Sequence, residues 1–108
     1  MAIKNVDATT LKQWLAENKA VLIDVRETNE NACERIKQAH NIPLNSISVD
    51  KLPDYQDKKL VIHCHLGKRS MAACLQLTEE MPSLEVYNLE GGISAWTSQG
   101  LPVESGKK

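Results

Sequence analysis

The stretch KKLVIHCHLGKRSMAACLQLTEEM, residues 58–81, decides the fold of this chain. Its first part, residues 58–64, contains a continuous apolar run that is typical of a buried parallel strand. Its last part, residues 68–81, predicts a helix, which Pro82 ends. On this helix we expect the core-facing residues to be Ala72, Leu75, Ala73 and Leu77. A loop containing Cys64 therefore joins a strand to a helix.

Strand and helix signals alternate through the rest of the sequence. Further strands are expected at residues 20–25, 39–44 and 84–89, and further helices at residues 7–18, 29–36 and 91–100, with one helical turn in 48–53. Asp7, Thr9 and Thr10 are candidate N-caps for the first helix. This alternation predicts an α/β fold with a mainly parallel sheet of about five strands and helices on both faces. The polar tail, residues 103–108, is expected to be frayed.

Composition indicates an ordinary globular protein. The chain has 108 residues and a net charge of −1, which suits one domain spanning 1–108 and gives no positive field for nucleic acid. Three cysteines, Cys33, Cys64 and Cys74, do not make a disulfide framework. No signal peptide and no 18-residue apolar stretch occur. We therefore expect a cytoplasmic monomer with reduced thiols and no membrane insertion.

Cys64 lies where an α/β sheet binds its ligands, just beyond the carboxyl end of a strand. The free N–H groups and the dipole of the following helix favour an anion there, and they lower the pKa of a thiol from its usual value of about 8.5. Gly67 lets the backbone take a positive φ or approach a ligand closely. The loop therefore predicts a nucleophilic thiolate.

Charges at both ends of this helix oppose the helix dipole. Lys68 and Arg69 stand at its start, and Glu79 and Glu80 at its end. Such local conflicts are expected at functional sites. We interpret the two cations as groups that attract an external anion.

Zinc binding is the alternative for this loop, because His63, Cys64 and His65 are all zinc-ligand types. Successive residues of an extended chain point to opposite sides, however, so the three side chains cannot share one face. His40 is the only other histidine. We therefore expect no metal site.

Three segments together resemble the rhodanese family, the thiosulfate and persulfide sulfurtransferases. VLIDVRETNENACERIKQAHNIPL at 21–44 is similar to the family's D-V-R-E strand end and following segment. VIHCHLGKRS at 61–70 resembles its C-x-x-G-x-R-S catalytic loop, and LEGGISAWTSQGLPV at 89–103 its closing G-G-x-x-A-W segment. The sequence departs from the family pattern at Asn31, Glu34, Arg35 and Gln38, all before the expected strand at 39–44.

The resemblance implies a three-layer rhodanese-like fold and a sulfurtransferase mechanism without a cofactor. Cys64 would take a sulfane sulfur from a small anionic donor such as thiosulfate or a persulfide. It would then pass that sulfur to cyanide, a thiol or a protein thiol. The loop residues that would bind the substrate are His65, Leu66, Gly67, Lys68, Arg69 and Ser70.

Other functions compatible with the same loop remain open. The chain could be a persulfide carrier that delivers sulfur to a protein partner. A phosphatase or arsenate reductase is disfavoured, because those fold relatives carry C-x5-R whereas Cys64 and Arg69 form C-x4-R. A non-catalytic binding module usually lacks the loop cysteine, which is present here.

The remaining notable residues have structural interpretations. Cys74 is expected to be a buried small hydrophobic residue, with a resolving thiol as the alternative. Cys33 is expected to be a partly buried structural thiol, with a redox partner of Cys64 as the alternative. Asp24 and Arg26 are typical of scaffold residues, with the carboxylate accepting backbone N–H groups. Trp14 and Trp96 are expected to pack on helices. His63 is expected to be a core histidine with its hydrogen bonds satisfied. His65 is expected only to line the mouth of the loop, and tuning of the thiolate is its alternative role.

Overall fold

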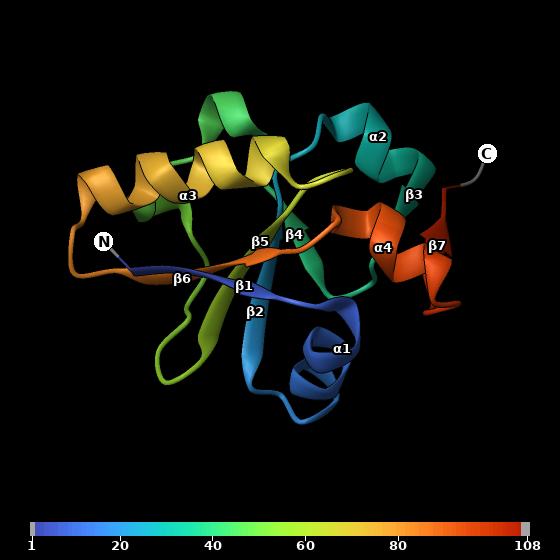
Figure 1. Ribbon diagram of the computed structural model, residues 1–108. Helices are drawn as coiled ribbons and strands as arrows, with labels where there is room; N and C mark the ends of the chain where they lie inside the picture. Colours follow the sequence, from blue (N-terminus) through green and yellow to red (C-terminus); the bar gives the residue numbers. More distant parts are fainter. Residues whose placement is uncertain (1, 107–108) are drawn as a thin grey trace.

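Five parallel strands form the central sheet of the computed structural model, which describes residues 2–106, at Ala2 by its backbone alone (Figure 1). In spatial order the strands are β1 (Ala2–Val6), β6 (Glu85–Leu89), β5 (Lys59–His63), β2 (Ala20–Asp24) and β4 (Ala39–Asn41). The predicted α/β fold is confirmed, and the four strands predicted from the sequence correspond to β2, β4, β5 and β6. β1 was not located, because an edge strand with alternating polar residues gives a weak signal in only five positions.

Helices cover both faces of the sheet and give three layers (Figure 1). One face is covered by α3 (Lys68–Glu80) and by the 3-10 turns η1 (Leu44–Ser46) and η2 (Val49–Lys51); the other is covered by α1 (Ala8–Ala16) and α4 (Gly92–Ser98). α2 (Thr28–Cys33) follows the carboxyl end of β2. Asp7 is the N-cap of α1, since its Oδ1 accepts the Thr10 N–H at 2.8 Å. Within residues 2–106, no helix is long and apolar enough to span a bilayer.

Successive side chains of β2 and β5 point to opposite faces of the sheet, and this divides the core into two clusters. Val21 and Ile23 pack on the α3 side, whereas Leu22 packs on the α1 and α4 side. The same alternation continues past β5, where Ile62 and Cys64 belong to the α3 side. The segment that carries Cys64 is therefore already buried against α3 where it leaves the sheet.

The buried face of α3 differs from the expected one. Ala73, Cys74 and Leu77 are fully buried, but Ala72 is exposed and Leu75 is 44% exposed, so the prediction was wrong for these two. The orientation follows from Ser70, which is also fully buried and begins an i, i+3, i+4, i+7 stripe. A polar residue at the start of the stripe hid this pattern in the sequence.

The helix predicted at 29–36 ends at Cys33, and a two-strand ribbon follows it. β3 (Glu34–Arg35) pairs antiparallel with β7 (Glu104–Ser105), and the Gly106 N–H donates to the Cys33 carbonyl at 2.9 Å. Arg26 Nη2 holds the Glu34 carbonyl at 2.6 Å, which keeps the chain extended there. The prediction of a frayed tail was therefore wrong for residues 104–105, while residues 107–108 lie outside the described part of the chain.

Candidate active site at Cys64

The Cys64 side chain lies at the junction of β5 and α3, almost wholly buried. Its Sγ accepts a hydrogen bond from the Gly67 N–H at 3.0 Å and lies 3.4 Å from Ser70 Oγ. A cavity of about 280 Å³ lies beside this residue, lined by Cys64, His65, Leu66, Lys68 and Arg69. The structure therefore brings the six other predicted loop residues close to Cys64: Gly67 and Ser70 contact its sulfur, and the other four line the cavity.

Donors around the sulfur favour its ionised form. Burial raises the pKa of Cys64, but the Ser70 hydroxyl and the backbone N–H groups of Ser70, Gly67 and Leu66 outweigh it. The pKa of this thiol consequently lies below its ordinary value. A larger fraction of thiolate at neutral pH makes Cys64 a better nucleophile.

Gly67 gives the loop its shape. Its φ is +116°, a conformation that side-chain-bearing residues rarely adopt, and it is the N-cap of α3. Its carbonyl accepts the Met71 N–H at 3.2 Å and so begins the helix, while its own N–H faces Cys64. One glycine thus both starts α3 and supplies a donor to the sulfur.

The amino end of α4 holds the other side of the loop. The Ile93 N–H donates to the Cys64 carbonyl at 2.9 Å, and the Ser94 N–H donates to the His65 carbonyl at 3.1 Å. A Cβ atom on Gly92 would lie 2.4 Å from both carbonyl oxygens. α4 therefore fixes the carbonyl side of the loop, a role that sequence reasoning missed and that only the Gly91–Gly92 pair could have signalled.

The two cations at the start of α3 have different environments. Arg69 forms a two-pronged ion pair with Glu30 of α2, at 2.7 and 3.0 Å. Lys68 is exposed and has no ion pair with the residues that the structure describes. The interpretation of both cations as groups that attract an external anion stays a prediction; at Arg69 the approach of α2 already supplies a counter-ion, Glu30.

The Arg69–Glu30 pair changes the titration of both partners. Hydrogen bonding from Arg69 lowers the pKa of Glu30 to about 2, and hydrogen bonding to Glu30 raises the pKa of Arg69.

At the other end of α3, Glu80 accepts the Val49 N–H at 2.9 Å. This contact gives one of the two acidic residues that oppose the helix dipole a structural role.

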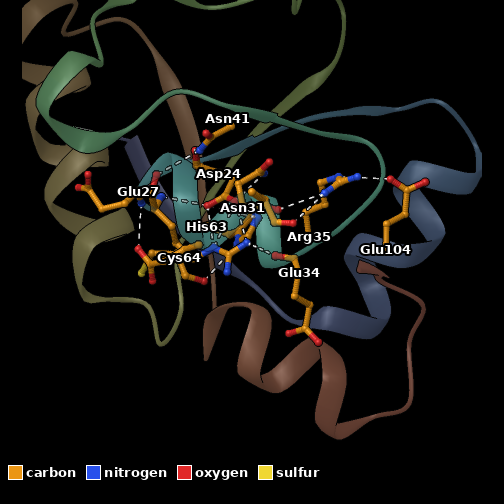
Figure 2. A network of polar contacts seen from close by, with 12 residues as sticks. Asp24, Glu27, Asn31, Glu34, Arg35, Asn41, His63, Cys64 and Glu104 are labelled. Atoms are coloured by element: carbon orange, nitrogen blue, oxygen red, sulfur yellow. Dashed lines mark hydrogen bonds and ion pairs between the residues drawn. The ribbon is translucent and has the colours of Figure 1, made fainter. Parts of the chain in front are cut away.

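A buried polar network supports α2 beside the site (Figure 2). Asp24 accepts the backbone N–H of Arg26 at 2.9 Å and its Nη2 at 2.9 Å, and Asn31 Nδ2 donates to the same carboxylate at 3.0 Å. Burial raises the pKa of Asp24, but hydrogen bonding from the Arg26 guanidinium, from Asn31 and from the Arg26 N–H outweighs it, so the pKa lies below its ordinary value. The scaffold interpretation of Asp24 and Arg26 is confirmed. By tying α2 to β2, the network positions Glu30 opposite Arg69.

His63 is buried, as predicted, but only one of its ring nitrogens has a partner. Nδ1 lies 3.1 Å from the Cys64 carbonyl oxygen, whereas Nε2 has no hydrogen bond and stands 3.9 Å from Asp24 Oδ1. The expectation of a satisfied core histidine was therefore wrong for Nε2. Burial lowers the pKa of His63, which favours the neutral ring.

The other thiols and the tryptophans are not among the residues that line this loop cavity. Cys74 is fully buried in α3, as predicted, and burial raises its pKa to about 12. Cys33 is exposed, so the prediction of a partly buried thiol was wrong; α2 ends there and turns into β3. Trp96 is buried with its Nε1 donating to the Pro102 carbonyl, and Trp14 packs edge-on against Tyr87. Within residues 2–106, no three His, Cys, Asp or Glu side chains gather into a metal-ligand set.

Comparison with known proteins places this geometry in a family. The Rhodanese-like domain family matches residues 7–99. A protein named sulfurtransferase from Allochromatium vinosum is 35% identical over 94% of this chain and 94% of its own length. Thiosulfate sulfurtransferase GlpE of Pseudomonas fluorescens is 33% identical over 80% of this chain and 78% of its own. A crystal structure of a rhodanese-related protein from Thermoplasma volcanium has a TM-score of 0.78 at 30% identity, covering 94% of this chain and 97% of the other.

Proposed function

The chain belongs to the rhodanese-like domain family, and from this premise we propose that it is a sulfurtransferase that carries a sulfane sulfur on Cys64. The observation that carries the proposal is the position of Cys64, whose Sγ lies 3.0 Å from the Gly67 N–H at the start of α3 and which lines a cavity. Relatives named sulfurtransferase and thiosulfate sulfurtransferase support the reaction class.

In the first step the Cys64 thiolate attacks the outer sulfur of the donor. With thiosulfate, the new bond joins Sγ to that sulfur, the sulfur–sulfur bond of the donor breaks, and sulfite leaves with the bonding electron pair. The product is a persulfide anion on Cys64. Lys68 attracts the doubly charged donor, and the amino end of α3 stabilises the negative charge that moves onto the bound sulfur.

In the second step a nucleophilic acceptor attacks the outer sulfur of the persulfide. Cyanide takes that sulfur as thiocyanate, and the Cys64 thiolate is restored. The donor product leaves before the acceptor reacts, so ping-pong kinetics are expected. Every group that this cycle needs belongs to the chain or to its two substrates, and no cofactor takes part.

The loop length argues for sulfur over a phosphate ester. Four residues separate Cys64 from Arg69, one fewer than in the C-x5-R loop of the phosphatase relatives. A shorter loop leaves a smaller ring of N–H donors, which suits one sulfur atom better than a tetrahedral oxyanion. The engagement of Arg69 with Glu30 further reduces its capacity to clamp a phosphoryl group.

The test is sulfur loading measured by intact-mass spectrometry. Incubation with thiosulfate should add the mass of one sulfur atom to the wild-type protein, and cyanide should remove it as thiocyanate. Cys64→Ala should abolish both events, while Cys74→Ala should keep them. A wild-type protein that gains no cyanide-removable sulfur from thiosulfate or from a glutathione persulfide would contradict the proposal.

Delivery of sulfur to a protein thiol is the second candidate. Leu66 is 63% exposed at the cavity mouth, which offers an apolar contact beside the sulfur. The measurement is transfer of labelled sulfane sulfur from loaded Cys64 to a reduced dithiol protein, to glutathione and to cyanide. Faster transfer to the protein thiol supports delivery; preference for cyanide supports the small-molecule reaction.

A further inference from the structure

The side chain of Asn88 lies behind the hydroxyl that touches the nucleophile. Asn88 is in β6, in register with Ile62 of β5, and only 6% of it is exposed. Its Oδ1 accepts a hydrogen bond from Ser70 Oγ, which lies 3.4 Å from Cys64 Sγ. One hydroxyl therefore connects a buried carboxamide to the sulfur.

The Ser70 hydroxyl has one proton and three neighbours that can accept it. These are Asn88 Oδ1, the Gly67 carbonyl at 3.1 Å and Cys64 Sγ. While Cys64 is a thiol, its S–H can donate to Ser70 Oγ, and Ser70 can donate onward to Asn88. Both hydroxyl functions are then satisfied, and the distances from Ser70 Oγ to Sγ and to Asn88 Oδ1 fit this arrangement.

Ionisation of Cys64 breaks this arrangement. A thiolate only accepts, so Ser70 must turn its proton toward Sγ to stabilise the charge. Ser70 Oγ and Asn88 Oδ1 would then face each other without a proton between them, which is unfavourable in a buried site. A half-turn of the carboxamide brings Nδ2 onto Ser70 Oγ. It gives up the long 3.4 Å hydrogen bond from Nδ2 to the Gly67 carbonyl, which Oδ1 then faces, in exchange for a hydrogen bond beside the thiolate. That carbonyl keeps the Met71 N–H as a donor.

We propose that Asn88 is a positioning residue for Cys64: its carboxamide reverses when the thiol ionises and so supports the Ser70 hydroxyl as a donor to the thiolate. The inference rests on the proposed function in taking Cys64 as the reactive group. Its test uses ionisation of the thiol and needs no sulfur transfer. A failure of the proposal for Asn88 is therefore distinguishable from a failure of the proposed sulfurtransferase function.

Other groups near the sulfur are common to every variant of the test. The charged and titratable ones are Arg69 with its partner Glu30, Lys68 and Cys74 from α3, His63 at the end of β5, Asp24 beyond it, and His65 in the loop. The residues of β6 and α4 that contact the loop, Asn88, Gly92, Ile93 and Ser94, carry no charge. A change confined to Asn88 can thus be assigned to its own hydrogen bonds and charge.

The first measurement is the pH profile of Cys64 alkylation, followed by peptide mass spectrometry so that exposed Cys33 does not contribute. Asn88→Asp keeps the shape but can only accept, so we expect the midpoint to rise by about one pH unit, a tenfold change in the ionisation constant. In a Ser70→Ala background the same substitution should move the midpoint much less. Asn5→Asp is the charge control, since Asn5 is exposed on β1 in register with Asn88. Equal shifts in both backgrounds would overturn the proposal.

The second measurement uses the unaltered site, so it does not depend on a variant that folds. Nuclear Overhauser contacts from the Asn88 side-chain amide protons to the Ser70 β-protons should strengthen above the midpoint of Cys64 ionisation. Cys64→Ser, which does not ionise in that range, should remove the change. Contacts that stay the same on both sides of the midpoint would overturn the proposal.

Discussion

The guanidinium of Arg69 and the carboxylate of Glu30 form a two-pronged ion pair between α3 and α2, with Nη1–Oε1 at 2.7 Å and Nη2–Oε2 at 3.0 Å. Their side chains are 37% and 32% exposed, so solvent screens the pair. Arg69 lies in the first turn of α3, directly after the Cys64 loop, whereas Glu30 lies in α2, which the Asp24 network supports. The ion pair therefore joins the site loop to the scaffold beside it.

This pair should make stability depend on pH in an acidic window. The pKa of Glu30 falls from 4.5 to about 2 in the folded chain, so the stabilisation is complete above pH 4.5 and is lost as pH falls toward 2. Allowing for screening, we expect Glu30→Gln to lower the free energy of unfolding by about 1 kcal/mol at neutral pH. Urea denaturation of both proteins between neutral pH and pH 3 measures the difference. Glu79→Gln, on the exposed side of α3, is the control; a difference that does not shrink with acid would contradict the assignment.

Lys68 should act on the donor through long-range attraction. It lines the cavity and has no ion pair among the residues that the structure describes. We expect Lys68→Met to raise KM for thiosulfate roughly two- to fivefold with kcat little changed, and added salt should reduce the difference. Steady-state transfer to cyanide at two ionic strengths measures this, with Lys12→Met in α1 as the control. A fall in kcat at constant KM would instead indicate a contact made in the transition state.

The three thiols should differ sharply in reactivity. Cys64 has a lowered pKa, Cys33 is exposed, and burial raises the pKa of Cys74 to about 12. In the folded protein at neutral pH, iodoacetamide should modify Cys64 and Cys33 and leave Cys74 untouched until a denaturant is added. A time course of peptide mass spectrometry measures each site. Labelling of Cys74 at the rate of Cys33 would mean that α3 opens readily from the sheet.

Local sequence patterns were sufficient to predict the centre of the fold and the position of Cys64 between a strand and a helix. The apolar run before Cys64 and the helix after it depend on neighbouring residues only, so periodicity reveals them. The buried face of α3 was misjudged at Ala72 and Leu75, because fully buried Ser70 begins the inward stripe. Apolar patterning cannot identify a buried hydroxyl whose partners are a sulfur and a carboxamide.

Features that join distant segments could not be predicted. The Arg69–Glu30 pair depends on where α2 lies, and α2 is held by the buried Asp24 network rather than by its own apolar face. The β3–β7 ribbon has two residues per strand, too few for any period, and it depends on the Arg26 contact with the Glu34 carbonyl. Each is a tertiary contact with no local signal.

Gly92 provides the sharpest test of how the loop is held. It has a φ of +58°, and an added Cβ would lie 2.4 Å from the Cys64 and His65 carbonyl oxygens. Gly100 is the matched control, because its φ is +73° and an added Cβ would meet nothing within 4 Å. Alanine at either position must adopt a left-handed backbone, but only at Gly92 must it also displace the loop.

We expect Gly100→Ala to lower the free energy of unfolding by about 1 kcal/mol, the strain of a left-handed alanine. Gly92→Ala adds a clash with backbone that cannot rotate away, so its loss should be about 2–4 kcal/mol. Because the displaced carbonyls belong to the loop around the sulfur, alkylation of Cys64 should also slow in Gly92→Ala and stay unchanged in Gly100→Ala. Urea denaturation and alkylation rates measure the two effects. Equal losses of stability with equal alkylation rates would show that the contact between α4 and the loop does not hold the nucleophile in place.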